Sequence, residues 1–479
     1  MNRFTLLALF GFYCLPVNAQ FSAAVQGIVL DPSQSAVPNA KVTLITASTG
    51  ITVETQTSTS GFYRFSSLAP GSYEIKVVAS GFRLPTIAVA LTTGQTRDLN
   101  INLEVQGVGE TVSVTAEASV LDTAESRQQI TMEQKVLRDI PLLNNSIFAI
   151  LGLAPGVTGV NGASDNFNPE YFANMSANGA SSRGNTYNVD GLSVTSNITN
   201  GTANLGMNPE AVAELTVETN TFKAEQGMGS SIVVSITTKS GTNQFHGSGN
   251  YWFTNQSMLA RTSLPFVARY LPFKRNNVSG AFGGPIKKNR TFFFAAVELL
   301  KQNAASVSAE TFESPAFVNW AKGKYPTTLG VKLLNEYPVS APVITNSNFR
   351  NAQQILGSDC GASSASGIPC DMPMLAQGTW NRAPKRDGLQ YNFRGDQYFR
   401  DSRDRISGSF VRTESTNENL VSRPTLNNTS ARFVNGFQSN YTHTFNPNVR
   451  NLESAPSKPC TRLPETPNSL RTLGLKVWV

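Results

Sequence analysis

Histidine and cysteine are the residues best suited to chemistry in this sequence, and both are scarce. The two histidines, His246 and His443, lie far apart in segments that alternate like β-strands. No serine or cysteine has a recognisable base motif, no glycine-rich phosphate loop follows a strand, and no spacing fits a metal site. The sequence therefore predicts no enzyme, no catalytic residue, no metal and no cofactor. It favours a structural role for both histidines.

The cysteines suggest one covalent link. Cys360 and Cys370 flank a stretch rich in Gly, Ser and Ala, and the oxidising environment outside the cytoplasm would let them pair. A metal pair is disfavoured because only aspartates accompany them. The sequence therefore predicts a disulfide within a loop, with Cys460 left over.

The N-terminus has the features of a secretory signal. Arg3 precedes an apolar run over residues 4–15, and small residues lead to a cleavage site between Ala19 and Gln20. A lipoprotein anchor at Cys14 is the disfavoured alternative, since the residues before it are bulky. No later run of 18 apolar residues is present, which leaves a secreted protein or a β-barrel.

Composition argues against nucleic-acid binding. The 39 Lys and Arg residues exceed the 32 Asp and Glu residues by seven, and the basic residues are scattered. Charged residues make up only 15% of the chain, while Phe (28) far outnumbers Trp (4). This mixture is typical of a β-rich wall and unusual for a soluble enzyme.

Residues 21–105 are predicted to form a small β-sandwich. Short alternating segments recur about every ten residues between Gly, Pro and Asn corners. The segments 27–31, 38–44 and 61–75 resemble the carboxypeptidase regulatory-like domain. That resemblance implies a seven-stranded, transthyretin-like sandwich without peptidase activity. Four aromatic residues are predicted to lie in its core, with a sugar-binding platform as the alternative: Phe62, Tyr63, Phe65 and Tyr73.

A short β-prone stretch follows the sandwich, after a flexible lead-in at 106–109. It consists of Glu110, Thr111, Val112, Ser113, Val114, Thr115 and Ala116. Such a stretch is suited to strand addition, in which its backbone pairs with the open sheet edge of a partner. It is similar to the box through which TonB-dependent outer-membrane transporters bind TonB. The alternative is that Val112 and Val114 begin the next folded part.

The rest of residues 106–230 is predicted to form a plug of mixed α/β structure. A helix is expected over 132–140 and a strand over 212–220. The segment 183–191 resembles a plug signature that ends in Val-Asp-Gly. Asp190 and Gly191 are predicted to form a turn, with a place near the ligand-facing apex as the alternative.

Residues 231–450 alternate as the strands of a transmembrane barrel do, with apolar residues on one face and polar residues on the other. In one segment, for example, Phe437 and Gln438 are expected on opposite faces. Strands are predicted at 231–239, 245–253, 277–283, 290–299, 388–399, 403–412 and 431–445. A long extracellular loop is predicted over 301–386.

Three runs resemble Oar-like TonB-dependent receptors: 238–247, 282–286 and 291–294. The predicted fold is therefore mainly β, with a transthyretin-like sandwich, a mixed α/β plug and the first strands of a transmembrane β-barrel. About seven strands are recognisable, whereas a plugged transporter has about 22. Residues 451–479 lose the alternation and are predicted to be an aberrant tail. The sequence thus predicts an incomplete, C-terminally truncated barrel.

The resemblance implies a TonB-dependent outer-membrane receptor whose plug is gated by TonB. Its implied partners are TonB with the inner-membrane energising complex, outer-membrane lipid and an extracellular ligand of unknown identity, with carbohydrate as one option. The sandwich is expected in the periplasm. Two alternatives stay open: a surface adhesion or carbohydrate-binding protein without transport, and a non-functional gene fragment.

Overall fold

The computed structural model describes most of the chain between residues 23 and 462. The described residues are 23–83, 86–105, 128–140, 143–159, 166–167, 175–196, 198, 201–220, 222, 229–259, 271–340, 342–399, 404–446 and 449–462. The signal cleavage site at Ala19 and Gln20 and the candidate box from Glu110 to Ala116 lie outside them. So does most of the predicted tail.

The N-terminal part is the predicted sandwich. One sheet has the strand order β4-β1-β8, with β9 paired to β1, and the other has the order β3-β2-β5-β7. Their bounds are β1 (Ala23–Leu30), β2 (Lys41–Thr46), β3 (Thr52–Gln56), β4 (Phe62–Leu68), β5 (Gly71–Val78), β7 (Ile87–Leu91), β8 (Thr96–Asp98) and β9 (Ile101–Asn102). A small ribbon pairs β6 (Phe82–Arg83) with β10 (Glu104–Val105). Alternate residues of the strands point into one apolar core, as an aligned sandwich requires.

The second part, called the plug below, is built on a five-stranded sheet of order β11-β16-β17-β14-β15. The strands of this sheet are β11 (Gln128–Glu133), β14 (Thr186–Val189), β15 (Leu192–Ser193), β16 (Val212–Asn220) and β17 (Val233–Thr238). The other elements are α2 (Gln134–Asp139), η1 (Leu143–Asn145), η2 (Ile147–Leu153), β12 (Val157–Thr158), β13 (Ser176–Ala177), η4 (Ser182–Gly184) and η5 (Pro209–Ala211). The predicted helix is shorter than expected, because Met132 belongs to β11.

The third part, called the wall, is a seven-stranded antiparallel sheet of order β18-β19-β20-β24-β25-β26-β27. Its strands are β18 (His246–Asn255), β19 (Phe273–Lys287), β20 (Thr291–Ala304), β24 (Lys385–Phe399), β25 (Asp404–Asn419), β26 (Asn428–Asn446) and β27 (Val449–Arg462). Short 3-10 turns η7 (Gln256–Met258) and η9 (Pro424–Leu426) lie between strands. Because β18 and β27 stand at the two ends of this order, the described strands form an open sheet. The mainly β fold class is confirmed.

One predicted wall strand lies elsewhere. Residues 231–239 were expected to be the first strand of the barrel, but β17 pairs with β16 and β14 inside the plug sheet. The prediction that wall strands begin at residue 231 is therefore wrong. Val233, Val234 and Ile236 are all buried, so both faces of β17 are covered and neither faces lipid. At the other end, β27 crosses the boundary predicted at residues 450 and 451.

The predicted long loop between β20 and β24 is a folded unit, called the excursion below. Its sheet has the order β21-β23-β22. The elements are β21 (Ser306–Glu313), α3 (Pro315–Lys324), α4 (Leu329–Glu336), β22 (Val343–Asn351), α5 (Ala352–Leu356), η8 (Gly357–Asp359) and β23 (Pro373–Arg382). A small core of Phe312, Ala376 and Trp380 holds it together. Few side chains of the excursion are buried. Its strands therefore show little alternation of apolar and polar residues, which is why the sequence predicted a loop.

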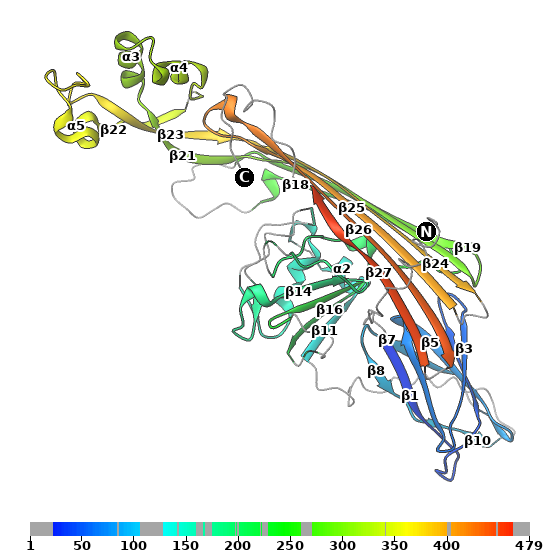
Figure 1. Ribbon diagram of the computed structural model, residues 1–479. Coiled ribbons are helices and arrows are strands. Elements are labelled where there is room, and N and C mark those ends of the chain that lie inside the picture. Colours follow the sequence, from blue (N-terminus) through cyan, green and yellow to red (C-terminus); the bar gives the residue numbers. More distant parts are fainter. Residues whose placement is uncertain are drawn as a thin grey trace, which may run out of the picture.

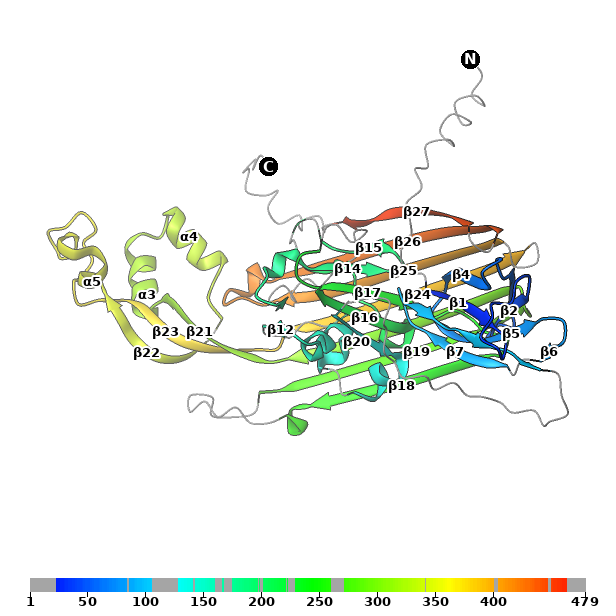
Figure 2. The ribbon, with the colours of Figure 1, turned by 90° about the horizontal axis from the view of Figure 1, so that it is seen from below.

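The parts have a simple arrangement. The plug lies against one face of the wall, the sandwich lies at one end of the wall strands, and the excursion extends from the opposite end (Figures 1 and 2). These two ends are called the sandwich end and the excursion end below. Within the described residues, no helix is both long and apolar enough to cross a membrane.

The two faces of the wall differ in chemistry. The inner face is the one that meets the plug, and it buries polar side chains such as Asn277, Glu298 and Gln390. The outer face leaves large apolar side chains exposed: Val278, Phe282, Val297, Leu299, Phe393 and Phe437. The predicted division of β26 is confirmed, since Phe437 is 48% exposed and Gln438 only 4%.

Candidate functional site

A tight hairpin in the plug positions the aspartate of the predicted Val-Asp-Gly signature. β14 and β15 pair so that Val189 lies opposite Leu192, which leaves Asp190 and Gly191 as a two-residue turn. Both have positive φ, 47° and 93°. A turn of this kind suits Asp-Gly, because aspartate tolerates the left-handed region and glycine enters it freely. The turn is at the inner face of the wall.

Asp190 makes a dense set of hydrogen bonds to the end of β17. The Thr238 backbone N–H donates to Asp190 Oδ1 over 2.9 Å, and the Thr238 hydroxyl donates to Oδ2 over 2.5 Å. From the wall, the Gln438 side-chain amide donates to the Asp190 carbonyl. The carboxylate is thus held by two hydrogen bonds from its own sheet.

Arg394 on β24 joins this aspartate to the wall. Its Nη1 lies 3.2 Å from Asp190 Oδ1 and donates to the Thr238 hydroxyl over 2.8 Å and to the Thr238 carbonyl over 3.0 Å. The other side of the guanidinium contacts Asp396, with Nε 3.1 Å from Oδ2. Asp396 Oδ1 in turn accepts from Arg405 Nη2 on β25 over 2.7 Å.

These five residues, Asp190, Thr238, Arg394, Asp396 and Arg405, are called the ion network below. Two positive and two negative charges alternate in it, so its formal charge is balanced. The Asp190 side chain is 9% exposed, that of Arg394 11% and that of Asp396 2%. Charges removed from water to this degree attract each other more strongly than surface charges, and breaking such a set leaves an uncompensated charge. The network therefore ties the plug to the wall.

A second polar cluster joins η5 to β18. Glu210 accepts from the Ser248 hydroxyl over 2.5 Å and from the Asn250 amide over 2.6 Å. Lys239, just after β17, places its Nζ 3.7 Å from the same carboxylate. Burial lowers the pKa of Lys239 to about 8, and the nearby Glu210 carboxylate opposes that shift.

A third cluster centres on Glu298 of β20, which is 1% exposed. Its Oε1 accepts from Asn277 over 2.7 Å and from Asn145 of the plug over 3.1 Å. Near it, Arg275 of β19 donates to the side chain and the backbone carbonyl of Asn144. Apolar contact accompanies these bonds, since Phe294 and Val411 of the wall belong to the plug's main core.

The sandwich meets the plug at a buried carboxylate. The Thr93 backbone N–H donates to Glu214 Oε1 over 2.8 Å, and the Thr93 and Thr237 hydroxyls lie 3.0 Å apart. Burial raises the pKa of Glu214, and the hydrogen bonds from Thr93 and Thr216 oppose that rise. Glu133, directly across the β11–β16 pair, adds to the rise as a like charge.

The histidines are placed in separate settings. His443 Nδ1 lies 2.6 Å from Oδ1 of Asp404, the same atom that accepts from the Tyr441 hydroxyl over 2.7 Å. His246 is exposed and lies near Thr242 and the Gln244 carbonyl. Over the described ranges, no three His, Cys, Asp or Glu side chains are grouped as a metal site would require.

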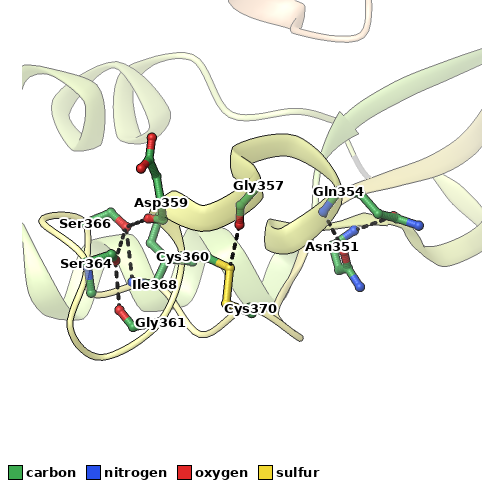
Figure 3. The surroundings of a disulfide bond; sticks show 11 residues. Asn351, Gln354, Gly357, Asp359, Cys360, Gly361, Ser364, Ser366, Ile368 and Cys370 are labelled. Atoms are coloured by element: carbon green, nitrogen blue, oxygen red, sulfur yellow. Dashed lines mark hydrogen bonds between the residues drawn. A yellow bond between two sulfur atoms is a disulfide. The ribbon is translucent and has the colours of Figure 1, made fainter.

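Cys360 and Cys370 form a disulfide at the far end of the excursion. Figure 3 shows the loop that it closes, in which Ser364 and Ser366 bond to nearby backbone groups. The preceding helix α5 begins with a capping box between Asn351 and Gln354. Serine turns and this cap explain why a segment with so little apolar content holds a fixed form.

The four sandwich aromatics divide unequally. Tyr63, Phe65 and Tyr73 are at most 4% exposed and belong to the core, as predicted, while Phe62 is 38% exposed. Tyr63 and Tyr73 also bond through their hydroxyls to backbone carbonyls within the sandwich. These three rings therefore present no sugar-binding platform.

Four of the five network residues were not predicted as site residues from the sequence: Thr238, Arg394, Asp396 and Arg405. The alternation of β24 does indicate buried charges, because Arg394 and Asp396 fall on the same face of this strand as the buried Gln390 and Asn392. Charges on the inner side of a wall strand need a partner there. The partner itself lies about 200 residues earlier in the chain, which alternation alone does not reveal.

The comparisons with known proteins agree with this organisation. Residues 237–454 match the family described as "Outer membrane beta barrel domain", and residues 24–104 match "Carboxypeptidase regulatory-like domain". A TonB-dependent transporter Oar from Myxococcus xanthus is 26% identical over 292 residues, which cover 57% of this chain. The chain spans about a quarter (26%) of that relative's length.

Two solved structures are also similar. The outer membrane transporter YddB from Escherichia coli is 13% identical with a TM-score of 0.43, and the match covers 66% of this chain and 37% of that one. The siderophore receptor PirA from Acinetobacter baumannii is 12% identical with a TM-score of 0.32, covering 66% and 45%. Likeness at this level carries no argument of its own. The sequence matches do: this chain is a homologue of the TonB-dependent transporter Oar, with a carboxypeptidase regulatory-like domain followed by an outer membrane beta barrel domain.

Proposed function

We propose that this chain acts as a TonB-dependent outer-membrane receptor, in which the plug blocks the lumen side of the wall until TonB acts on it. The observation that carries the proposal is the ion network. A plug tied to a membrane wall by buried charges is held firmly, yet a directed pull can separate the two, because polar contacts are replaced by contacts with water. The homology to a TonB-dependent transporter supports the same reading.

The two faces of the wall support a place in the outer membrane. Exposed Val, Leu and Phe side chains on the outer face fit lipid, and buried polar side chains on the inner face fit a lumen filled by the plug. We infer that residues 1–19 direct export, with cleavage after Ala19. The sandwich would then lie in the periplasm and the excursion outside the cell, since they occupy opposite ends of the wall (Figure 1).

No enzymatic step is part of this proposal, because the polar clusters at the plug–wall interface are engaged in structural hydrogen bonds and ion pairs. A ligand from outside the cell would contact the excursion end of the plug and the wall, and the excursion itself, because this end is proposed to face outward (Figure 1). Burial of three of the four sandwich aromatics weighs against glycan binding by the sandwich as the main activity.

The candidate box can be tested without knowing the ligand. Val114→Cys in the full chain should form a disulfide with cysteines placed in the sheet-edge strand of TonB, because strand addition brings the two backbones side by side. Adding Val112→Pro should strongly reduce the yield, since proline removes an N–H and blocks extended pairing.

Ser126→Cys serves as the matched control, since it lies in the same connecting segment outside the box. Little cross-linking is expected there. Equal yields at positions 114 and 126, or a yield at 114 that Val112→Pro leaves unchanged, would reject the box and with it the proposed energy coupling.

A further inference from the structure

The sandwich contacts the plug and the wall at the same end of the molecule, and it does so at separate points. At the first point, Thr93 binds Glu214 and Thr237 of the plug sheet. Thr93 is 3% exposed and Glu214 6%. These hydrogen bonds are therefore buried between the two parts, unlike the water-exposed contacts of a loosely tethered domain.

At the second point, the turn between β2 and β3 contacts two wall-side turns. Asn243 donates its backbone N–H to the Ser48 carbonyl over 3.1 Å and its side-chain amide to the Thr49 carbonyl over 2.6 Å. The Asn243 side-chain amide also donates to Asn289 Oδ1, and the Asn289 backbone N–H donates to Asn243 Oδ1. Asn289 lies in the turn that follows β19. The turn fits closely here, since a Cβ at Gly50 would lie 3.0 Å from Asn289 Oδ1.

Between these points the sandwich faces the ion network. A cavity of about 160 Å³ is lined on one side by sandwich residues, among them Pro70 and Tyr73. The other side is lined by Thr238, Arg394 and Arg405. Three of the five network residues thus border a space that the sandwich covers.

We propose that the sandwich is a latch for the plug: docked, it shields the ion network from bulk water, and it must leave before the network separates. Opposite charges attract more strongly when water is kept away, so the docked sandwich strengthens the tie between plug and wall. Undocking opens the cavity to solvent, and solvated charges separate at lower cost. Residues 106–127 connect the sandwich to the plug in sequence, so a pull by TonB on the candidate box would act on both the sandwich and the plug. This effect of TonB rests on the proposed function, whereas the latch itself does not.

The latch can be tested by thiol labelling of the full chain in membranes. Thr442→Cys, which lines the cavity from β26, reports access in a Cys460→Ser background. A PEG-maleimide too large for the cavity should label it slowly. Adding Asn243→Ala and Thr93→Val should raise the rate about tenfold, as expected for losing two or three hydrogen bonds at the docking points. Glu54→Ala, an exposed change on the sandwich, should leave the rate unchanged.

Misfolding of the Asn243→Ala, Thr93→Val variant would also raise the labelling rate, so a second measurement fixes the sandwich in its docked position instead of releasing it. Thr93→Cys with Thr237→Cys, without the reporter, should form a disulfide because the two hydroxyls already lie 3.0 Å apart. With the disulfide formed, amide hydrogen exchange of the hairpin at 186–193 should be several-fold slower than after reduction.

The latch is contradicted if Thr442→Cys is labelled at one rate in every variant, or if the cross-link leaves exchange at 186–193 unchanged. Neither readout uses TonB or a ligand. A failed latch would therefore leave the proposed coupling intact, and a failed TonB cross-link would leave the latch intact.

Discussion

At the scale of single residues, Arg394 is the most informative side chain in the structure. It contacts Asp190 of the plug and Asp396 of its own strand, and it is 11% exposed. Removing it would leave two carboxylates inside the interface without their shared cation. Its role explains why the predicted Val-Asp-Gly signature contains an acid: Asp190 supplies both a residue of the turn and the plug's charge in the ion network.

Arg394→Ala should lower the free energy of unfolding of the purified chain by about 3–5 kcal/mol, the usual cost of breaking a buried ion pair from one side. Thermal and denaturant unfolding in detergent would measure it. Arg138→Ala is the matched control, because its pair with Asp139 is about half exposed and should change stability by less than about 1 kcal/mol. Similar losses for the two variants would mean that the ion network stabilises the chain no more than an exposed ion pair does.

Glu214 predicts a pH dependence at the sandwich–plug contact. Because its pKa is raised, the folded chain binds more protons than the unfolded chain between the ordinary glutamate pKa and the raised value. Its contribution to stability therefore falls as pH rises through that window. Glu214→Gln keeps an oxygen for the Thr93 N–H and removes the titration.

The melting temperature of Glu214→Gln relative to the unchanged chain should thus rise from pH 4.5 to pH 8. Glu54→Gln, at an exposed sandwich position, should show no such trend. A difference that stays flat or falls with pH would show that folding does not raise the pKa of Glu214.

At the scale of elements, local chemistry predicted the turns and strand faces well. The Asp190-Gly191 turn follows from two residue types, and the faces of β26 follow from alternation alone. The assignment of β17 failed for a physical reason. The alternating Ile232, Val234 and Ile236 look like a membrane strand, but Val233 between them is buried as well. Pairing with β14 and β16, which alternation does not reveal, places β17 in the plug. Folding of the excursion escaped prediction because its main apolar cluster is small, with Phe312, Ala376 and Trp380 as its buried members.

Gly191→Val should destabilise the plug hairpin by about 1–3 kcal/mol, because a β-branched residue is strained at the positive φ of this position. Gly191→Asn should cost less, since asparagine tolerates the left-handed region. Hydrogen exchange at 186–193 would show the loss locally. Equal behaviour of the valine and asparagine variants would mean that backbone strain is not what selects glycine here.

At the scale of the whole molecule, the wall, the plug and the sandwich all contribute to one interface. The wall offers an inner face with buried charges, the plug brings Asp190 to it, and the sandwich covers the end where they meet. The general order of these parts follows from sequence resemblance, and the fold class is confirmed. Their contacts do not follow from it, because Thr93 with Glu214, and Asp190 with Arg394, join residues more than 100 positions apart.

The proposed orientation, with the sandwich in the periplasm and the excursion outside the cell, is tested most directly by labelling from outside the cell. Lys322→Cys on α3 and Lys76→Cys on β5 place exposed thiols at the excursion end and in the sandwich. In a Cys460→Ser background, each variant would be treated in intact cells with a maleimide that does not cross membranes. In the proposed orientation, position 322 is labelled in intact cells, and position 76 is labelled only after the outer membrane is permeabilised. Labelling of position 76 in intact cells, or protection of position 322, would contradict it.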